Sequence, residues 1–331
     1  MGKVLTFGEV LLRLATQKSE FLEDGRALQM NFGGSEANVA VNLAHLGNTA
    51  THITVLPENK IGYAAKDFLN RHYVNTDYLQ FEEGRMGAYF VETGVGNRAS
   101  NVVYDRQYSA FSMTKSLKSE LCQNCEETEA IFVSGITSAL SDKLQDSVMR
   151  LIQMGYKKKK LCVYDINYRE KLWETREQAF EVTKRYLPFI DVLSAGILDL
   201  RVLLNDESID DLEAGYKRLV EEYPNLKAIF STTRVTHSTE EYEIVGNLFV
   251  NGKLYQTSQQ PIHHVVDRIG TGDAFAAGVI HGLLKQDEPQ HLIDFAIANM
   301  ILKHSIYGDV NTFSEEEVEK YLNSQAGVIQ R

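Results

Sequence analysis

The clearest chemical signal lies in residues 265–278, where a β-branched apolar pair leads into a glycine turn and then into a helix of small residues. Because Gly270 and Gly272 lack a Cβ, the backbone can bend tightly there and its N–H groups can approach a ligand closely. A helix that begins near Asp273 leaves its first amides without intrahelical partners. These amides and the positive end of the helix dipole predict an anion site suited to phosphate.

Asp273 places a carboxylate at the mouth of this anion site, and two interpretations are open. Aspartate is a favoured N-cap residue, so the side chain could simply cap the helix. It could also be a general base that takes a proton from a substrate hydroxyl as that hydroxyl attacks a phosphate. The small residues in 274–282 give the helix a thin face that can pack closely on a sheet. This burial favours the second interpretation.

Two arginines, Arg106 and Arg169, follow strand-like segments rich in aromatic residues. Arginine offers a planar fork that grips a carboxylate through two hydrogen bonds. The pair could therefore form a local trap for an acidic substrate. The alternative is that each arginine pairs with a neighbouring carboxylate, Asp105 or Glu170.

The composition is that of an ordinary globular protein, and it argues against a nucleic-acid or membrane protein. The net charge of −11 argues against nucleic acid or an anionic membrane as the main partner. No apolar run reaches the roughly 18 residues needed to span a bilayer. The chain enters a strand-like segment at once, so no signal peptide is expected. Cys122 and Cys125 have metal-site spacing, but no second pair follows, which favours ordinary thiols in a reducing cytoplasm.

Strand-like and helix-like segments alternate along the chain. Strands are expected at 3–8, 52–56, 131–135, 161–166, 191–194 and 228–231, with hairpins over 87–106 and 242–257. Helices are expected at 37–46, 62–72, 143–155, 175–186, 212–223, 290–305 and 314–323. This alternation predicts a parallel sheet covered on both faces, in one domain over residues 1–331. Ligands of such sheets bind beyond the carboxyl ends of the strands.

Residues 267–278 read D-x-x-G-x-G-D-x-F-x-x-G, which resembles the long and fairly specific signature of the ribokinase-like (PfkB) sugar kinases. The resemblance implies that Asp273 is the catalytic base, that residues 270–273 form the anion hole, and that ATP and Mg²⁺ are the cofactors. Residues 32–40 resemble the family's N-terminal Gly-Gly signature, in which the glycines meet a sugar and Asn38 bonds to a hydroxyl. The implied fold is a ribokinase-like α/β fold, with a central mostly parallel sheet flanked by helices and a small β-sheet lid.

Four further segments resemble one branch of the family, the 2-keto-3-deoxygluconate kinases. They are residues 8–14, 104–110, 134–140 and 165–173, the last reading D-I-N-Y-R-E-K-L-W. The resemblance implies an acid substrate under a lid formed by about 10–32 and 86–110, with Tyr89 and Tyr104 facing it. The alternative for both tyrosines is the core of a hairpin. In the family such lids often pair two subunits, which implies a homodimer.

The chain departs from the family pattern at three places. The family's Asn-x-x-Glu aligns with 196–199, where Gly196 replaces the Asn and Asp199 keeps the carboxylate that would organise magnesium through water. The nucleotide loop aligns with 232–238, and Arg234 stands where a glycine is usual, so it could meet a phosphate with its own charge. Arg268 and Ile269 replace hydroxyl residues that ribokinases often carry, and no potassium site is predicted.

The expected activity is ATP-dependent phosphorylation of 2-keto-3-deoxygluconate at a primary hydroxyl. The alternatives are a PfkB-type kinase of a neutral sugar (fructose, ribose or a nucleoside) and a non-catalytic sugar-binding regulator. A neutral sugar would not need Arg13, Arg106 and Arg169 near the pocket. A dinucleotide-binding dehydrogenase is disfavoured because the glycine turn lies far from the first βαβ unit. The predicted catalytic residues are Asp273, Gly270, Thr271 and Gly272; the predicted substrate-binding residues are Gly33, Gly34, Asn38, Tyr89, Tyr104, Arg106, Arg169 and Asp273; the predicted nucleotide-binding residues are Thr232, Arg234, Gly270, Gly272 and Asn299; and Asp199 is the predicted metal residue.

Overall fold

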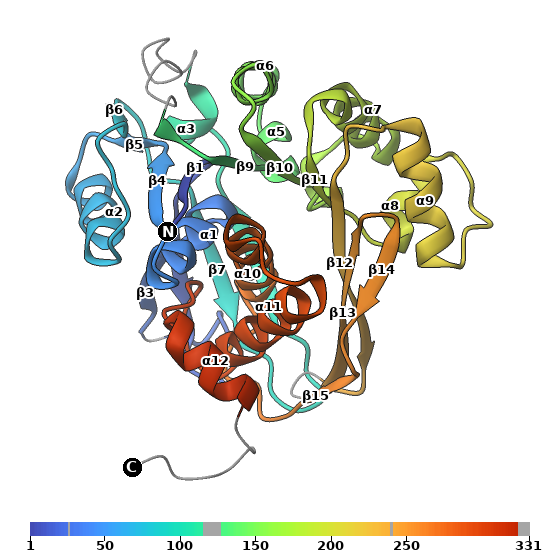
Figure 1. Cartoon of the computed structure of the whole chain (residues 1–331). Helices are drawn as coiled ribbons and strands as arrows, with labels where there is room; N and C mark the ends of the chain where they lie inside the picture. Colours follow the sequence, from blue (N-terminus) through green and yellow to red (C-terminus); the bar gives the residue numbers. More distant parts are fainter. Residues whose placement is uncertain (26, 115–126, 239–240, 324–331) are drawn as a thin grey trace.

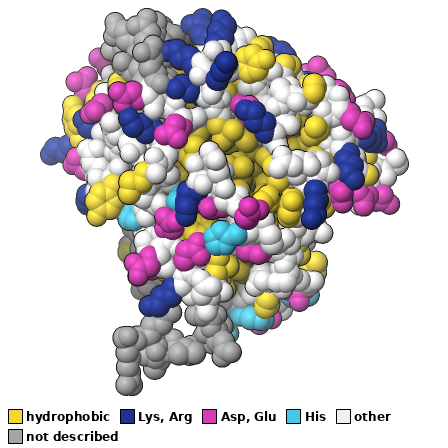
Figure 2. All heavy atoms as spheres, in the orientation of Figure 1, with side chains coloured by type: hydrophobic (Ala, Val, Ile, Leu, Met, Phe, Trp, Pro, Cys, Tyr) yellow, Lys and Arg dark blue, Asp and Glu magenta, His cyan; other side chains and the backbone are white. Residues whose placement is uncertain are grey.

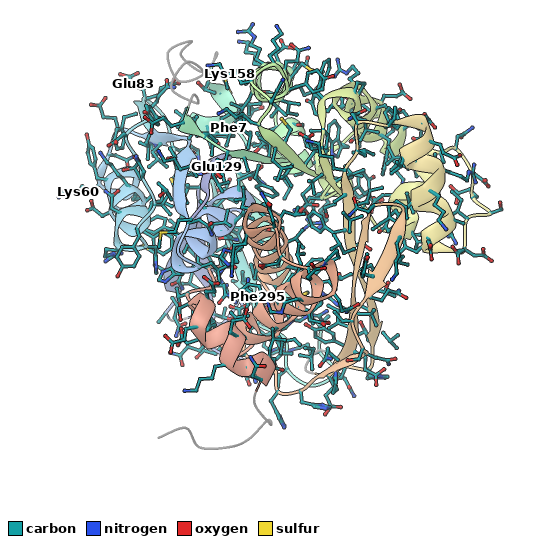
Figure 3. The ribbon with its side chains drawn as sticks, in the orientation of Figure 1. Phe7, Lys60, Glu83, Glu129, Lys158 and Phe295 are labelled. Carbon is teal, nitrogen blue, oxygen red and sulfur yellow. The ribbon has the colours of Figure 1, made fainter. Side chains whose placement is uncertain are left out.

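The structure of the chain is a computed structural model that describes residues 1–25, 27–114, 127–238 and 241–323. Cys122 and Cys125 lie outside the described residues. Phe7 and Phe295 point into the interior, whereas Lys60 and Lys158 point outward (Figure 3). On the face shown in Figure 2, basic side chains are interspersed with acidic ones. In the described part of the chain, no helix is both long and apolar enough to cross a membrane.

A large twisted sheet forms the centre of the molecule. Its strands are β1 (Lys3–Phe7), β4 (Thr49–Ile53), β9 (Ala130–Ser134), β10 (Leu161–Asp165), β11 (Val192–Ser194), β12 (Ala228–Thr236), β13 (Tyr242–Val250), β14 (Lys253–Gln256) and β15 (Gln260–Ile262). The order is β14-β13-β12-β11-β10-β9-β1-β4, and β15 pairs with β13. The pairs from β4 to β12 are parallel and those made by β13 are antiparallel. The predicted mostly parallel sheet is confirmed.

Helices cover both faces of this sheet (Figure 1). Successive strand residues point to opposite faces, so apolar strand residues on each face pack against helices. One side packs α1 (Ser35–His45), α10 (Thr271–Lys285) and α11 (Pro289–Lys303), and the other packs α6 (Asp142–Lys157), α7 (Arg176–Tyr186), α8 (Ile197–Leu203) and α9 (Leu212–Glu222). Val4 and Phe132 belong to the apolar core on the side of α1, α10 and α11. Leu5 and Ile131 belong to the apolar core on the side of α6 to α9. The other α-helices of the described residues are α2 (Lys60–Arg71), α3 (Ala110–Met113), α5 (Gly135–Ser138) and α12 (Glu315–Asn323).

A separate four-stranded sheet lies beside the large one. Its order is β3 (Gln29–Gly33), β2 (Leu11–Ala15), β7 (Ala88–Glu92) and β8 (Asn101–Asp105). The predicted hairpin over 87–106 is the antiparallel β7–β8 pair, in which Tyr89 stands opposite Tyr104. Another pair, β5 (Val55–Pro57) with β6 (Gln80–Glu82), completes the strands.

The structure departs from the expected loop over 232–238. Strand β12 continues to Thr236 and pairs with β13 along its whole length. The run T-T-R-V-T is rich in β-branched residues, which suit a pleated strand better than a glycine-type loop. Side chains of this segment therefore alternate between the two faces of the sheet. The hairpin expected at Asn251-Gly252 is present, with φ values of 53° and 75° at the two residues.

Candidate active site

A cavity of about 550 Å³ opens beyond the carboxyl ends of the central strands. It lies between the four-stranded sheet and the N-terminal ends of α1 and α10, which is the expected place for a ligand in such a sheet. Gly33, Asp199 and Asn299 are not among its lining residues. The predicted site residues that line it are Gly34, Asn38, Tyr89, Tyr104, Arg106, Arg169, Thr232, Arg234, Gly270, Thr271, Gly272 and Asp273.

The two glycines of the turn before α10 have different surroundings. Gly270 is left-handed (φ 79°), and a Cβ there would lie 1.8 Å from the backbone oxygen of Asp309. A Cβ at Gly272 would meet nothing within 4 Å. The first helical hydrogen bond of this turn runs from Ala274 N–H to Gly270 O at 2.9 Å. The amides of Gly272 and Asp273 are thus placed at the cavity, where an anionic ligand can approach the backbone closely.

The carboxylate of Asp273 does not cap α10. The N-cap of that helix is Gly270, and no side chain caps it. The carboxylate instead accepts hydrogen bonds from Ser35 Oγ (2.9 Å) and Asn38 Nδ2 (2.7 Å), both on α1. Burial raises the pKa of Asp273 to about 6, and the two hydrogen bonds oppose this rise. The group is therefore ionised at neutral pH but poised to accept a proton.

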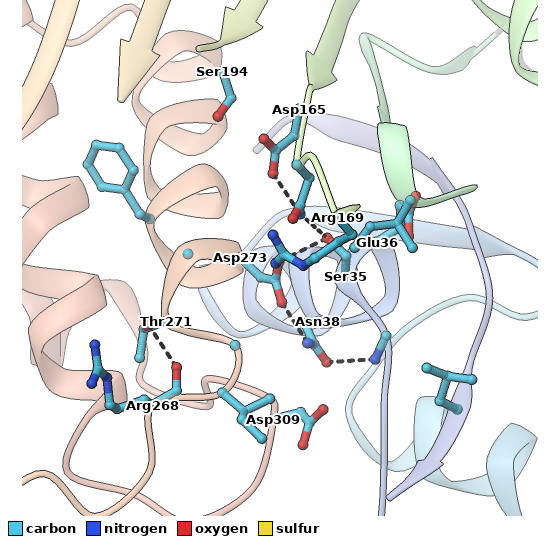
Figure 4. A pocket seen from close by; sticks show the side chains of 18 of the residues that line it. Ser35, Glu36, Asn38, Asp165, Arg169, Ser194, Arg268, Thr271, Asp273 and Asp309 are labelled. Atoms are coloured by element: carbon cyan, nitrogen blue, oxygen red, sulfur yellow. Dashed lines mark hydrogen bonds between the residues drawn. The ribbon is translucent and has the colours of Figure 1, made fainter. Parts of the chain in front are cut away.

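A second carboxylate, Asp165, lies at the end of β10 and belongs to the same network (Figure 4). Asn167 donates to Asp165 Oδ2 (3.1 Å) and to Ser35 Oγ (3.2 Å), which links β10 to α1 and to Asp273. Burial raises the pKa of Asp165 to about 6. The two carboxylates therefore titrate in the same pH range.

The two predicted carboxylate-binding arginines differ in their surroundings. Arg106 is buried and already paired: its Nε and Nη2 contact Glu9 Oε2 at 2.9 and 2.5 Å. Its partner is thus Glu9 rather than Asp105, which pairs with Arg85. Arg169 is exposed at the cavity, donates to the backbone oxygen of Tyr168 (3.1 Å), and forms no ion pair with any residue that the structure describes. Arg169 is the more available of the two for an anionic ligand.

The two tyrosines form an aromatic wall of the cavity. Tyr89 and Tyr104 stack with ring centroids 5.7 Å apart, Tyr89 being buried and Tyr104 half exposed. The Tyr89 hydroxyl donates to Asp309, and burial raises the pKa of Tyr89. Asp309 also explains why a glycine occupies position 33, because a Cβ at that position would lie 2.1 Å from Asp309 Oδ2. Gly33 therefore makes room for a carboxylate of the chain itself.

Four acidic residues that line the cavity were absent from the predicted site: Glu9, Glu36, Asp165 and Asp309. Glu36 is fully buried and accepts hydrogen bonds from Ser134 and Thr137 at the end of β9. Its place next to Ser35 in the N-terminal glycine signature was a usable signal. Asp309 follows no local pattern, and only the packing of its loop against the glycine turn brings it to the site.

Arg13 and Asn299 do not line the cavity, and their side chains bond to other residues of the protein. Arg13 does not line this cavity: it is 1% exposed and contacts Asp267 Oδ2 at 2.7 Å and Asp309 Oδ1 at 2.9 Å. Asn299 is fully buried, and its Nδ2 donates to Asn42 Oδ1 and to Ala274 O, both at 2.7 Å. The side chain of Asn299 supports α10, and Asn299 is not among the residues that line the cavity.

The carboxylates near β10 and α8 suit a nucleotide-borne Mg²⁺, which usually takes one or two carboxylates and the substrate phosphates. Asp165 lines the cavity, and Asp199 lies close enough for its charge to raise the pKa of Asp165. Asp199 itself accepts the Gly196 N–H at 2.8 Å. Among the described residues, no three His, Cys, Asp or Glu side chains converge on one point, so the protein alone builds no metal cage.

Comparison with known proteins decides the family. Residues 1–312 match the pfkB family of carbohydrate kinases. The chain belongs to the PfkB carbohydrate kinase family. It is similar to the 2-dehydro-3-deoxygalactonokinase of Haloferax volcanii, with 31% identity over 331 residues, 99% of each chain. The resemblance drawn from the motifs is confirmed.

Solved structures of this family share the fold. A PfkB family carbohydrate kinase from Listeria grayi superposes with a TM-score of 0.93 and 37% identity, over 97% of this chain and 100% of that one. The 2-dehydro-3-deoxygluconokinase of Thermotoga maritima superposes with a TM-score of 0.92 and 34% identity, over 98% and 100%. The predicted ribokinase-like architecture, including the small separate sheet, is confirmed.

Proposed function

We propose that this PfkB protein is an ATP-dependent kinase that phosphorylates a primary hydroxyl of a 2-keto-3-deoxy sugar acid, with 2-keto-3-deoxygluconate as the first candidate. The observation that carries the proposal is Asp273, a buried carboxylate at the cavity that Ser35 and Asn38 hold beside Gly272, where a Cβ would meet nothing within 4 Å. The names of the Thermotoga maritima and Haloferax volcanii proteins support the substrate class.

In the proposed reaction, the substrate hydroxyl transfers its proton to the Asp273 carboxylate as its oxygen attacks the γ-phosphorus of ATP in line. Ser35 and Asn38 hold that carboxylate in place. The amides of residues 270–273 stabilise the negative charge that develops on the phosphoryl oxygens. Mg²⁺ bound with ATP would neutralise part of the same charge, with Asp165 and, through water, Asp199 as its protein contacts.

The acid group of the substrate is assigned to Arg169 and Arg106. Arg169 faces the cavity without a carboxylate partner in the described chain, and its fork suits two hydrogen bonds to a carboxylate. Arg106 would contribute charge from beside Glu9, next to the Tyr89–Tyr104 wall. Gly34 and Asn38 are proposed to meet the sugar on the opposite side, and Thr232 and Arg234 the nucleotide.

A neutral-sugar kinase is the second candidate, and one observation favours it. Glu9 already neutralises Arg106, which leaves Arg169 as the arginine at the sugar side that makes no salt bridge with a described residue. A relative at 24% identity is named a probable fructokinase of Arabidopsis thaliana.

A coupled ADP-release assay over sugar acids and neutral sugars tests the two candidates. The panel contains 2-keto-3-deoxygluconate, 2-keto-3-deoxygalactonate, gluconate, fructose, ribose and adenosine, each with ATP and Mg²⁺. The proposal expects one of the 2-keto-3-deoxy acids to give the highest kcat/KM. Highest turnover with fructose, ribose or adenosine would replace it with the second candidate, and ligand binding without any ADP release would indicate a regulator.

The four-stranded sheet is proposed to act as a lid within a single kinase domain and to pair two subunits. Its face away from the cavity carries one apolar residue from each strand in register, namely Met30, Leu14, Phe90 and Val103. Met30 and Val103 are 57% and 47% exposed, as expected of a surface that a second copy covers. Light scattering should show a dimer that Val103→Asp dissociates; a monomeric wild type would contradict the pairing.

A reducing cytoplasm remains the proposed location, in keeping with the free, buried Cys162.

A further inference from the structure

Two arginines that are distant in sequence meet on one tyrosine ring at the cavity. The guanidinium carbon of Arg234, on β12, lies 4.7 Å from the ring centroid of Tyr242 on β13. That of Arg268, which precedes the glycine turn, lies 4.8 Å from the same centroid. Both arginines line the cavity, while Tyr242 is 1% exposed and packs against His304. The buried ring thus fixes both cations at the cavity wall.

Neither cation has a carboxylate partner within the described chain. Arg13 and Arg106, by contrast, are each paired with acidic residues at 2.5–2.9 Å. Partial burial lowers the pKa of Arg234 to about 10, and the adjacent charge of Arg268 adds to this shift. Two like charges held together without a counter-charge repel each other, and a bound anion removes that repulsion. The arrangement is therefore organised for an anionic ligand.

We propose that Arg234 and Arg268, held by Tyr242, form a clamp for the polyphosphate of a nucleoside triphosphate. A guanidinium plane binds phosphate oxygens through two parallel hydrogen bonds, and two such planes match a chain of phosphates. Because residues 232–236 are a β-strand, side chains here supply the contacts that a glycine loop would supply through its backbone. The clamp rests on the proposed kinase function, and it identifies two residues that bind the phosphates of the nucleotide.

The position of Arg268 favours the nucleotide over the sugar acid. In Figure 4, Arg268 and Thr271 lie on one side of Asp273, and Ser35 and Asn38 lie on the other. The Thr271 hydroxyl donates to Arg268 O at 3.0 Å, which ties the backbone of the arginine to the turn that carries Gly272 and Asp273. A phosphate held by those amides is therefore continuous with the clamp.

Calorimetric binding of ATP, ADP, AMP and adenosine to the full-length protein tests the clamp. Arg234→Met and Arg268→Met keep an apolar stem on the ring but remove the charge. Each variant should weaken ATP and ADP about 10- to 150-fold, AMP less, and adenosine less than twofold. Lys253→Met is the matched control, because it removes a cation 4.7 Å from the Tyr255 ring centroid in β14, outside the cavity lining. It should leave the whole series unchanged.

Other outcomes overturn the clamp. An equal loss for ATP and adenosine would assign the arginines to folding, and unchanged ATP binding would show that they do not contact phosphate. A rise in the KM for the sugar acid with unchanged ATP binding would move the pair to the acid site. The wild-type substrate panel is measured separately, so an inactive wild type would reject the kinase proposal while this binding series still decides the fate of the clamp.

Discussion

Asp273 sets the pH dependence expected of the reaction. Burial raises its pKa to about 6, and a general base works only when it is ionised. The value of kcat/KM should therefore be full above about pH 7 and fall roughly tenfold per unit as the pH drops below about 6. A pH–rate profile measured at subsaturating sugar acid checks this.

The titration of Asp165 must be separated from that of Asp273 in this profile. The pKa of Asp165 is also raised to about 6, and the charge of Asp165 helps to raise the pKa of Asp273. Asp165→Asn keeps the shape and removes the charge, so the acidic limb should move to lower pH. A flat profile between pH 5 and 7 in the wild type would contradict the assignment of Asp273 as a titrating base.

Replacing Asp273 by asparagine separates its chemical role from its structural role. The amide keeps the size of the side chain beside Ser35 and Asn38 but cannot accept the substrate proton. We expect kcat to fall about 10²- to 10⁴-fold, with the dissociation constant for ATP largely unchanged. Near-normal turnover of Asp273→Asn would limit this residue to holding α1 against α10.

The two turn glycines should respond differently to alanine. Gly270→Ala places a methyl group 1.8 Å from Asp309 O in a left-handed backbone, so thermal unfolding should show a loss of at least about 1–3 kcal/mol. Gly272→Ala meets no atom within 4 Å and should melt like the wild type, but its methyl group should raise the KM for ATP. An unchanged ATP KM in Gly272→Ala would argue against phosphate approach at this amide.

At the scale of elements, Arg13 connects the four-stranded sheet to the glycine turn. From β2 it contacts Asp267 and Asp309, and Asp267 in turn accepts the Ile269 N–H at 3.0 Å and the Gly308 N–H at 3.1 Å. Arg13→Ala leaves two buried carboxylates without their cation. We expect a loss of about 3–5 kcal/mol in the free energy of unfolding, measured by urea denaturation.

The control for Arg13 is another ion pair of the same sheet, Arg98–Glu92, whose side chains are 30% and 12% exposed. Arg98→Ala should cost less than about 1 kcal/mol, because water screens the pair. Equal stability losses for the two variants would show that the buried contacts of Arg13 with Asp267 and Asp309 stabilise the fold no more than the Arg98–Glu92 pair does.

At the scale of the whole molecule, local patterns predicted the elements and the glycine turn before Asp273. The turn at Asn251-Gly252 needs two left-handed residues, and the glycine turn before Asp273 needs Gly270 in that conformation. Contacts between elements were not predictable in the same way. Arg13 meets Asp309 across 296 residues of sequence, so no local spacing reports the pair.

The same limit explains the differences in the candidate site. Arg106 follows β8 of the four-stranded sheet and pairs with Glu9 between β1 and β2, whereas a sequence offers only adjacent partners such as Asp105. Asn299 is polar but fully buried, because it joins α11 to α10 and α1. Burial of a polar group inside a helix pair leaves no signature that spacing alone can show.

The most direct test of the central claim compares a sugar acid with its neutral analogue in Arg169→Ala. Arg169 makes no salt bridge with a described residue, although its charge lowers the pKa of Asp165 and Asp273, so its removal breaks no ion pair, unlike removal of Arg106 from Glu9. We predict that kcat/KM for 2-keto-3-deoxygluconate falls roughly 30- to 4,000-fold. For the analogue in which the carboxylate is reduced to an alcohol, kcat/KM should stay within a few-fold of the wild-type value. Equal losses for the two substrates would show that Arg169 does not bind the carboxylate and would contradict the sugar-acid assignment.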